Sequence, residues 1–188
     1  MRTETMTDRA PMIQRYPEDR PLEEDIGLWW VLHTKPNCEK MVATYLLNRK
    51  ISYYLPTVQR KERVGGLGRI RTSEIPLFRG YLCVALEKKE HNRLYDTKKF
   101  VRILEVDDQT RFVQELNAVA RAVESYDDWT LRYGLAPGRK VLILSGPLAG
   151  FEGVLVRRKT DKQLALSVEM FNQSILVKLD PYTRLEPL

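Results

Sequence analysis

The sequence predicts an α+β protein in which an N-terminal module of strands and helices precedes a separate all-β module. Two observations lead to this prediction. Up to residue 125, strand-like segments of period two are interspersed with amphipathic helical segments, whereas after residue 136 only short strand-like runs follow. The 188 residues suffice for two small cores. We therefore divide the chain into a disordered tail (1–27), a first module (28–125), a linker (126–136) and a second module (137–188).

The first module opens with the segment GLWWVLHT, in which aromatic and β-branched residues alternate as they do in a strand. The following segment predicts a helix over about 37–48, because apolar residues recur there every three or four positions. The segment ISYYLPTVQ predicts a second strand that is interrupted at Pro56. Residues 81–86 predict a third strand, and a shorter one follows near 101–106. A last helix begins after Asp108, whose side chain can cap it.

Between the second and third strands lies the segment RKERVGGLGRIR, in which glycines separate two extended, arginine-rich arms. Glycines at the tip of two such arms predict a protruding hairpin. Beyond the linker, five short strand-like runs separated by turn residues predict a small barrel in residues 137–188.

Composition excludes several classes of protein. No apolar run approaches the ~18 residues of a membrane-spanning helix, and the acidic, proline-containing N-terminus does not have the pattern of a secretory signal. Two cysteines and two histidines without metal-ligand spacing indicate neither a disulfide scaffold nor a zinc site, so we expect a reducing cytoplasm and no cofactor or metal. The common catalytic motifs do not occur, which argues against an enzyme, although an unfamiliar site stays an alternative.

The net charge of +6 is concentrated in the middle of the chain, where residues 28–126 hold 18 basic and 11 acidic side chains. A positive field of this kind attracts polyanions. The predicted hairpin carries five cations that could neutralise DNA phosphates without reading bases; they are Arg60, Lys61, Arg63, Arg69 and Arg71. A flexible, solvated loop explains the same residues equally well.

The segment SEIPLFRGYLCVAL places large apolar residues at the mouth of the third strand. Strand alternation puts Tyr81 and Cys83 on one face. If that face is open, Phe78, Tyr81 and Cys83 form an exposed patch of the kind that marks a protein interface. If helices cover both faces, these residues are core, and periodicity alone slightly favours this second alternative.

Three segments together resemble the NusG family of transcription elongation factors. They are WWVLHTKPNCEKMVATYLLNRKISYYLP, IPLFRGYLCVAL and PGRKVLILSGPLAGFEGVLV, and they are similar in order and spacing to the aromatic first strand, the FFPGY-like strand and the KOW motif of that family. The resemblance implies an N-terminal NGN αβ domain and a C-terminal SH3-like β-barrel, the KOW domain. Arg79 stands where the family usually has proline, and Phe171, Asn172 and Gln173 replace the housekeeping triplet. The chain is therefore more similar to specialised members such as RfaH or the antiterminators of polysaccharide operons.

The resemblance implies partners rather than chemistry. The NGN domain would dock on the clamp helices of the RNA polymerase β′ subunit through His33, Phe78, Tyr81, Cys83 and Leu116. It would reach the β gate loop through His91, Asn92 and Arg93, and the basic hairpin would lie near upstream or non-template DNA. We expect a cytoplasmic monomer that suppresses pausing or termination.

For the KOW domain, the resemblance implies a small-subunit ribosomal protein or the termination factor Rho as partner, contacted by Phe151 and Phe171. Gly146, Gly150 and Gly153 suit its tight turns. Alternating β-branched runs favour the barrel over the helical hairpin that RfaH-like members can adopt. The alternative function is a KOW-type protein that binds RNA or the ribosome and has no activity on polymerase.

Overall fold

The computed structural model describes residues 13–64, 69–127, 129–157 and 162–188. It divides into two compact units, Met1–Glu105 and Val106–Leu188. The first unit is mixed α/β and the second is mostly strand, which confirms the predicted fold class.

The first unit is built on a five-stranded antiparallel sheet in the order β1-β3-β6-β2-β7. Its strands are β1 (Arg15–Tyr16), β2 (Leu28–Thr34), β3 (Ser52–Tyr54), β6 (Tyr81–Leu86) and β7 (Phe100–Glu105). The helix α1 (Glu39–Asn48) follows β2, and the small helices η2 (Lys88–Glu90) and α2 (Asn92–Tyr95) precede β7. The predicted first strand, helix and third strand are thus confirmed.

Helix α1 packs on one face of this sheet. Its apolar residues Val42, Ala43 and Leu46 share a buried cluster with strand residues that alternate along β2 and β6; these are Trp30, Leu32, Leu82, Val84 and Leu86. Strand alternation is the reason, because every second side chain of a strand points to the same face.

The segment 13–27, which the sequence predicts as part of a disordered tail, is ordered. Residues 13–16, here called the N-terminal arm, include the edge strand β1, which pairs with β3. The turn η1 (Leu22–Glu24) follows, with Leu22 buried and its carbonyl accepting a hydrogen bond from Trp29 Nε1 at 3.0 Å. Pairing with an existing sheet edge supplies β1 with backbone hydrogen bonds, and composition alone does not reveal such pairing. Residues 1–12 lie outside the described part.

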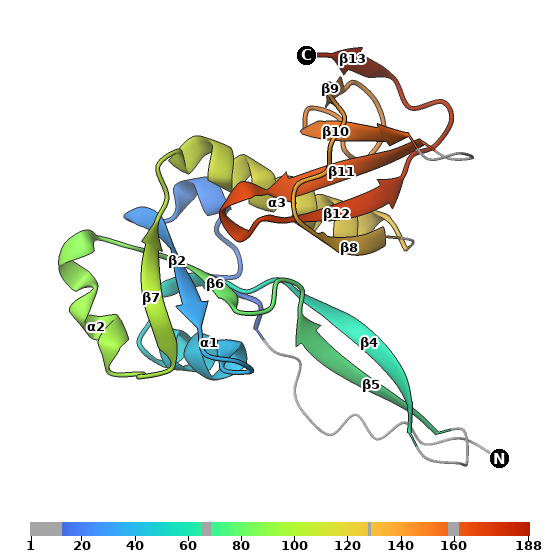
Figure 1. Cartoon of the computed structure of the whole chain (residues 1–188). Helices are drawn as coiled ribbons and strands as arrows, with labels where there is room; N and C mark the ends of the chain where they lie inside the picture. The colour runs from blue at the N-terminus through green and yellow to red at the C-terminus, as the bar shows by residue number, and fades with distance from the viewer. Residues whose placement is uncertain (1–12, 65–68, 128, 158–161) are drawn as a thin grey trace. The chain divides into compact units, whose positions relative to one another are not determined.

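Strands β4 (Thr57–Val64) and β5 (Arg69–Pro76) form the predicted hairpin as a two-stranded sheet of its own. Figure 1 shows it extending away from the five-stranded sheet of the same unit. Pro56 separates β3 from β4, as the sequence predicts. The predicted glycine tip, Gly65 to Gly68, lies outside the described residues.

The second unit contains helix α3 (Gln109–Ser125) and a six-stranded antiparallel sheet in the order β13-β9-β10-β11-β12-β8. Its strands are β8 (Trp129–Tyr133), β9 (Arg139–Ile143), β10 (Glu152–Arg157), β11 (Lys162–Val168), β12 (Gln173–Lys178) and β13 (Leu185–Pro187), with a short turn η3 (Glu169–Phe171) before β12. The Asp108 side chain caps α3 by accepting from the Arg111 amide at 2.9 Å. The strand β8 occupies much of the predicted linker (126–136), because its backbone completes the sheet beside β12.

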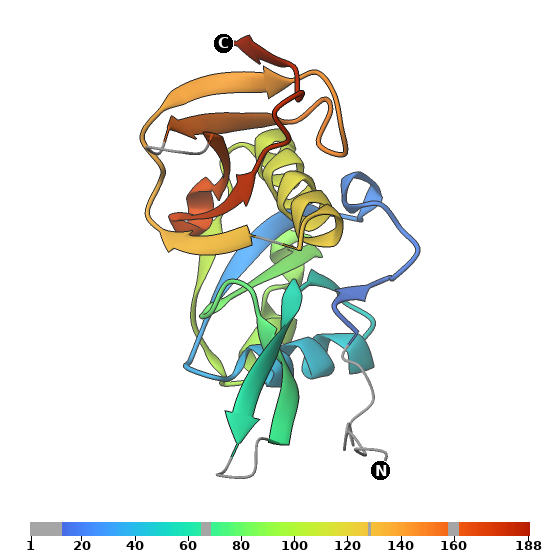
Figure 2. The ribbon, with the colours of Figure 1, turned by 90° about the vertical axis from the view of Figure 1, so that its right-hand side faces the viewer.

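Helix α3 belongs to the second unit by its contacts, whereas the sequence places it in the first module. Figure 2 shows the helix beside the strands of this unit. The ring of Phe112 lies edge-on to Phe171, with ring centroids 6.0 Å apart, and Arg111 forms an ion pair with Glu169. The division at residue 125 stays a prediction about which segment folds by itself.

Candidate interaction surfaces

His33 and Tyr81 form a stacked aromatic pair at the end of the first unit's sheet. They are direct partners in the β2–β6 ladder, and their ring centroids lie 5.4 Å apart with 21° between the ring planes. Both side chains are half-buried, so the pair keeps a surface that a partner can contact. Of the five residues predicted to dock on the polymerase, these two present such a surface.

The turn before Tyr81 is held by a buried carboxylate that sequence reasoning missed. Glu39, in the first turn of α1, accepts a hydrogen bond from the Gly80 amide at 2.7 Å and is only 4% exposed. The Gly80 carbonyl in turn accepts from the Thr34 amide at 2.8 Å. Gly80 has φ +84°, a left-handed conformation that glycine adopts without strain. The only sequence signal for this role is that Glu39 is a charged residue at the start of an apolar helix, and a solvent-exposed glutamate would give the same signal.

Phe78, Cys83 and Leu116 are buried, which corrects the expectation of an open apolar face. Phe78 is 1% exposed and Cys83 is fully buried beside the equally buried Val31, its partner in the ladder. Burial raises the pKa of the Cys83 thiol, so the thiol stays protonated at neutral pH. The physical reason is that this face carries apolar side chains too, and removing them from water is favourable.

The predicted gate-loop residues lie at a second place on the first unit. His91 packs edge-on against Trp30, with ring centroids 4.3 Å apart, and Asn92 and Arg93 are exposed. Arg93 is held by Glu90 Oε1 at 2.6 Å and by the Arg49 carbonyl at 3.1 Å. A cavity of about 390 Å³ lies beside them; it is lined by Trp30, Lys88, His91, Tyr95, Val101, Arg102, Ile103 and Glu105.

His91 has an unusual environment for a histidine near the surface. Its Nε2 atom is buried and has no hydrogen-bond partner among the described residues. Desolvation lowers the pKa of His91, and the nearby Lys88 cation lowers it further, while Glu105 acts in the opposite direction. The imidazole is therefore neutral at neutral pH.

The basic hairpin presents cations on both of its faces. Arg60 pairs with Ser73, and Arg71 pairs with Glu62 two positions further along the ladder, so both arginines share one face. Lys61 follows Arg60 directly and lies on the opposite face. All three side chains are exposed. The backbone of Arg63 and Arg69 belongs to the strands, but their side chains lie outside the described part of the structure.

In the second unit, the glycines of the KOW-like motif have distinct roles. Gly146 and Gly150 adopt positive φ values of +86° and +90° in the turn before β10, as the sequence predicts. Gly153 instead lies within β10, where a Cβ would meet Leu164 Cδ1 at 2.7 Å. Phe151 is half-buried and can contact a partner. Phe171, the other predicted partner residue, is 3% exposed and packs against Phe112, so it presents little surface to a partner.

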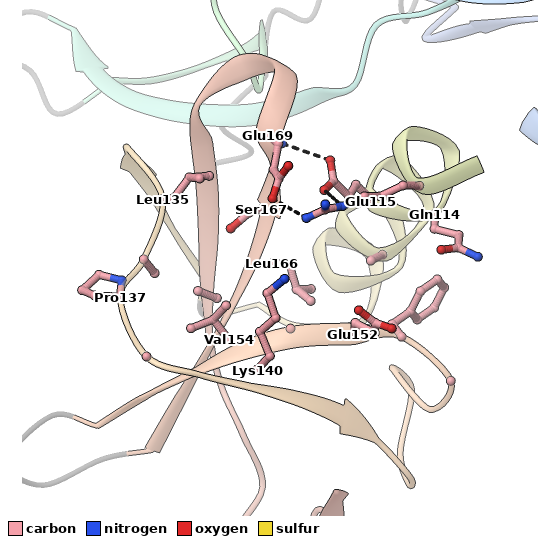
Figure 3. Close-up of a pocket in the computed structure, with 18 residues that line it drawn as sticks. Gln114, Glu115, Leu135, Pro137, Lys140, Glu152, Val154, Leu166, Ser167 and Glu169 are labelled. Atoms are coloured by element: carbon pink, nitrogen blue, oxygen red, sulfur yellow. Dashed lines mark hydrogen bonds and ion pairs between the residues drawn. The ribbon is translucent and has the colours of Figure 1, made fainter. Parts of the chain in front are cut away.

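A cavity of about 570 Å³, which the sequence did not predict, lies between α3 and the sheet of the second unit. Figure 3 shows Glu115 and Glu169 at one side of it, both held by Arg111. Burial raises the pKa of Glu115, partly offset by a hydrogen bond from the Glu169 amide at 3.0 Å. The cavity wall is mixed: apolar residues such as Ala136, Val154 and Leu166 lie beside polar ones such as Gln114, Lys140 and Glu152.

Within the described residues, no group of three or more His, Cys, Asp or Glu side chains is placed to hold a metal ion. None of the helices in that part of the chain has the length and apolarity needed to cross a membrane.

Two solved structures are similar to this chain. "Domain interaction in Thermotoga maritima NusG" has 18% sequence identity and a TM-score of 0.40, and the match covers 81% of this chain and 92% of that chain. "Crystal Structure of MjSpt4:Spt5 complex conformation B" has 14% sequence identity and a TM-score of 0.30, and the match covers 86% of this chain and 98% of that chain. Among curated proteins, none matches at a significant level. The family described as "Transcription termination factor nusG" matches residues 27–130. Since this match spans more than half of the 188 residues, the chain belongs to the NusG family of transcription factors.

Proposed function

We propose that this protein is a transcription elongation and antitermination factor that binds RNA polymerase. The observation that supports the proposal is the family match over residues 27–130, a range that contains β2 and β6 with the His33–Tyr81 pair. In this proposal, the pair forms the accessible part of the surface that contacts the clamp helices of the β′ subunit. Aromatic side chains suit this role because they bring a large contact area at a small entropic cost.

The mechanism needs no covalent chemistry. A factor that binds the closed clamp better than the open clamp shifts the polymerase from the paused towards the elongating state. A difference of ~1.4 kcal/mol in binding free energy changes the ratio of the two states about tenfold. A second contact from the His91–Arg93 segment to the β gate loop would strengthen the preference, and the exposed Asn92 and Arg93 support this assignment.

The basic hairpin supplies a contact to upstream or non-template DNA. Its exposed cations Arg60, Lys61 and Arg71 support a phosphate contact that does not depend on base sequence. The exposed Arg79, at the position where family members usually have proline, supports a specialised, RfaH-like member rather than the housekeeping factor.

The second unit would recruit a small-subunit ribosomal protein or Rho through Phe151. The two positive-φ glycines support this role, because they shape the turn that leads from β9 to Phe151, directly before β10. The same turn supports the alternative function, in which the protein binds RNA or the ribosome and has no effect on polymerase.

A co-purification from the host separates these functions. The tagged chain is expected to retain the polymerase β and β′ subunits, and Tyr81→Ala is expected to reduce both this retention and pause suppression in transcription with purified polymerase. Ribosome co-sedimentation that depends on Phe151, together with no retention of polymerase, would favour the alternative and contradict our proposal.

A further inference from the structure

The base of the basic hairpin is the place where the hairpin joins the rest of the first unit. Strands β4 and β5 form a two-stranded sheet that shares no ladder with the five-stranded sheet. Two strands alone have little stability in water, so groups at the base must hold such a ribbon in place. The base lies where β4 begins at Thr57 and β5 ends at Pro76.

The N-terminal arm lies at this base and is fixed to the sheet. Beyond the β1–β3 ladder, the Tyr53 hydroxyl donates a hydrogen bond to the Ile13 carbonyl at 2.7 Å. The Arg15 guanidinium lies 3.3 Å from the buried carboxylate of Asp25. These contacts fix the backbone on both sides of Gln14.

Gln14 connects the arm to both strands of the hairpin. Its carbonyl accepts a hydrogen bond from the Leu55 amide at 2.7 Å, and its Oε1 accepts one from the Thr57 amide at 3.1 Å. Its Nε2 donates to Glu74 Oε1 on β5 at 3.4 Å. A carboxamide suits this position because it offers an acceptor to one strand and a donor to the other.

Glu74 joins the hairpin to helix α1 as well. Its carboxylate accepts from the Thr57 hydroxyl, and its main-chain carbonyl accepts from the Lys40 ammonium group of α1. Thr57 and Glu74 lie on neighbouring strands, so this carboxylate also ties the two strands together. Three segments that are far apart in sequence therefore meet at one polar cluster, formed by Gln14, Lys40, Thr57 and Glu74.

We propose that Gln14 and Glu74 are positioning residues that hold the basic hairpin in one direction and so place its cations on the DNA. The part of this inference that concerns DNA rests on the proposed function, whereas the part that concerns the hairpin's direction does not. It also gives the N-terminal arm a role, since without the arm the hairpin would lose its connection through Gln14.

The direction of the hairpin can be measured in the full-length protein by residual dipolar couplings of backbone amides. In the wild type, the couplings of β4 and β5 should fit the same alignment as the five-stranded sheet. In Gln14→Ala they should become smaller and no longer fit that alignment. Asn48→Ala, which removes an exposed amide at the end of α1, is the matched control and should change nothing.

DNA binding gives the second readout. In complexes with polymerase, Gln14→Ala should weaken hairpin-dependent DNA protection about fivefold, the factor that one lost hydrogen bond corresponds to, and should leave retention of polymerase unchanged. Gln14→Glu should act similarly, because two carboxylates would face each other. In the double variant Gln14→Glu with Glu74→Gln, the amide at position 74 can donate to the carboxylate at position 14. This variant should therefore recover both the dipolar couplings and the DNA protection.

Unchanged dipolar couplings in Gln14→Ala and in Gln14→Glu would overturn the positioning role. If the hairpin of Gln14→Ala loses its fixed direction but the variant still protects DNA as well as the wild type, the proposed link between hairpin direction and DNA contact is overturned. If the wild-type protein neither retains polymerase nor protects DNA, the proposed function fails, and the dipolar couplings still decide whether Gln14 and Glu74 set the hairpin's direction.

Discussion

The rings of His33 and Tyr81 stack across two neighbouring strands, 5.4 Å apart and 21° from parallel. If this pair contacts the polymerase, Tyr81→Ala should weaken binding about tenfold or more, because it removes an aromatic anchor. Tyr81→Phe keeps the stacked ring and should bind nearly as well as the wild type. Tyr182→Ala, which removes a tyrosine ring that is 90% exposed in the second unit, is the matched control. Binding can be measured by titrating labelled polymerase, and equal affinities for Tyr81→Ala and Tyr182→Ala would contradict the assignment.

The two faces of the basic hairpin allow a test of its DNA contact by salt dependence. Each phosphate contact that is lost should make the plot of log affinity against log salt less steep by about one unit. We expect this change for Arg60→Gln with Arg71→Gln if their shared face meets DNA, and for Lys61→Gln if the opposite face does. Arg139→Gln, an exposed cation on β9, should have no effect. A salt slope that is the same in all variants would exclude phosphate contacts by Arg60, Lys61 and Arg71.

Gly27 is expected to tolerate no side chain. It has φ +95°, and a Cβ would lie 2.5 Å from the carbonyl carbon of Leu86, where backbone atoms cannot move aside. Gly27→Ala should therefore lower the free energy of unfolding of the first unit by about 3 kcal/mol or more. Gly134→Ala has a similar φ of +81° with nothing within 4 Å, and should cost only about 1 kcal/mol. Urea denaturation of both variants measures the difference, and similar values would show that close approach is not the cause.

The lowered pKa of His91 predicts that the free energy of unfolding decreases below neutral pH. Its pKa is lowered from 6.5 in the folded chain, so folding favours the neutral imidazole. The stabilisation is therefore complete above the unfolded pKa and is lost as the pH falls through the folded pKa. Relative to His91→Gln, the wild type should become less stable between about pH 7 and pH 5. Proton NMR of the two histidines measures the pKa directly, and a His91 midpoint at or above 6.5 would refute this account.

The two phenylalanines predicted as partner contacts should behave differently. Phe171 is buried against Phe112, so Phe171→Ala should destabilise the second unit by about 3 kcal/mol. Phe151→Ala removes a half-buried ring and should cost much less stability while it weakens binding of the ribosomal protein or Rho. Thermal unfolding and pull-down assays of both variants provide the measurement. A fully stable Phe171→Ala protein would contradict the burial argument.

Much of the fold was predictable because its signals are local. The alternation of GLWWVLHT specifies β2, the spacing of apolar residues specifies α1, and Asp108 marks the start of α3. The glycine-rich, basic segment similarly indicates a hairpin between β4 and β5. Each of these features depends on residues that are neighbours in sequence, and periodicity reports such neighbours directly.

The features that the sequence did not reveal all depend on residues that are distant in sequence. Residues 15 and 16 form a strand because β3 offers them an edge, and residues 129–133 form a strand because β12 lies beside them. The sequence also did not reveal the burial of Phe78 and Phe171. Strand alternation indicates the face of the sheet on which a side chain lies but not what covers that face.

The sequence by itself indicated the family, the order of most strands and helices, and five candidate docking residues that include His33 and Tyr81. Only the tertiary structure decided which apolar residues remain accessible and which groups meet at the base of the hairpin. The physical reason is that exposure and hydrogen bonding between remote segments are properties of the packed chain. The hydrogen-bond partners of Gln14 are distant in sequence, so its role becomes visible only in the fold, where β1 pairs with β3 and the Gln14 side chain contacts β4 and β5.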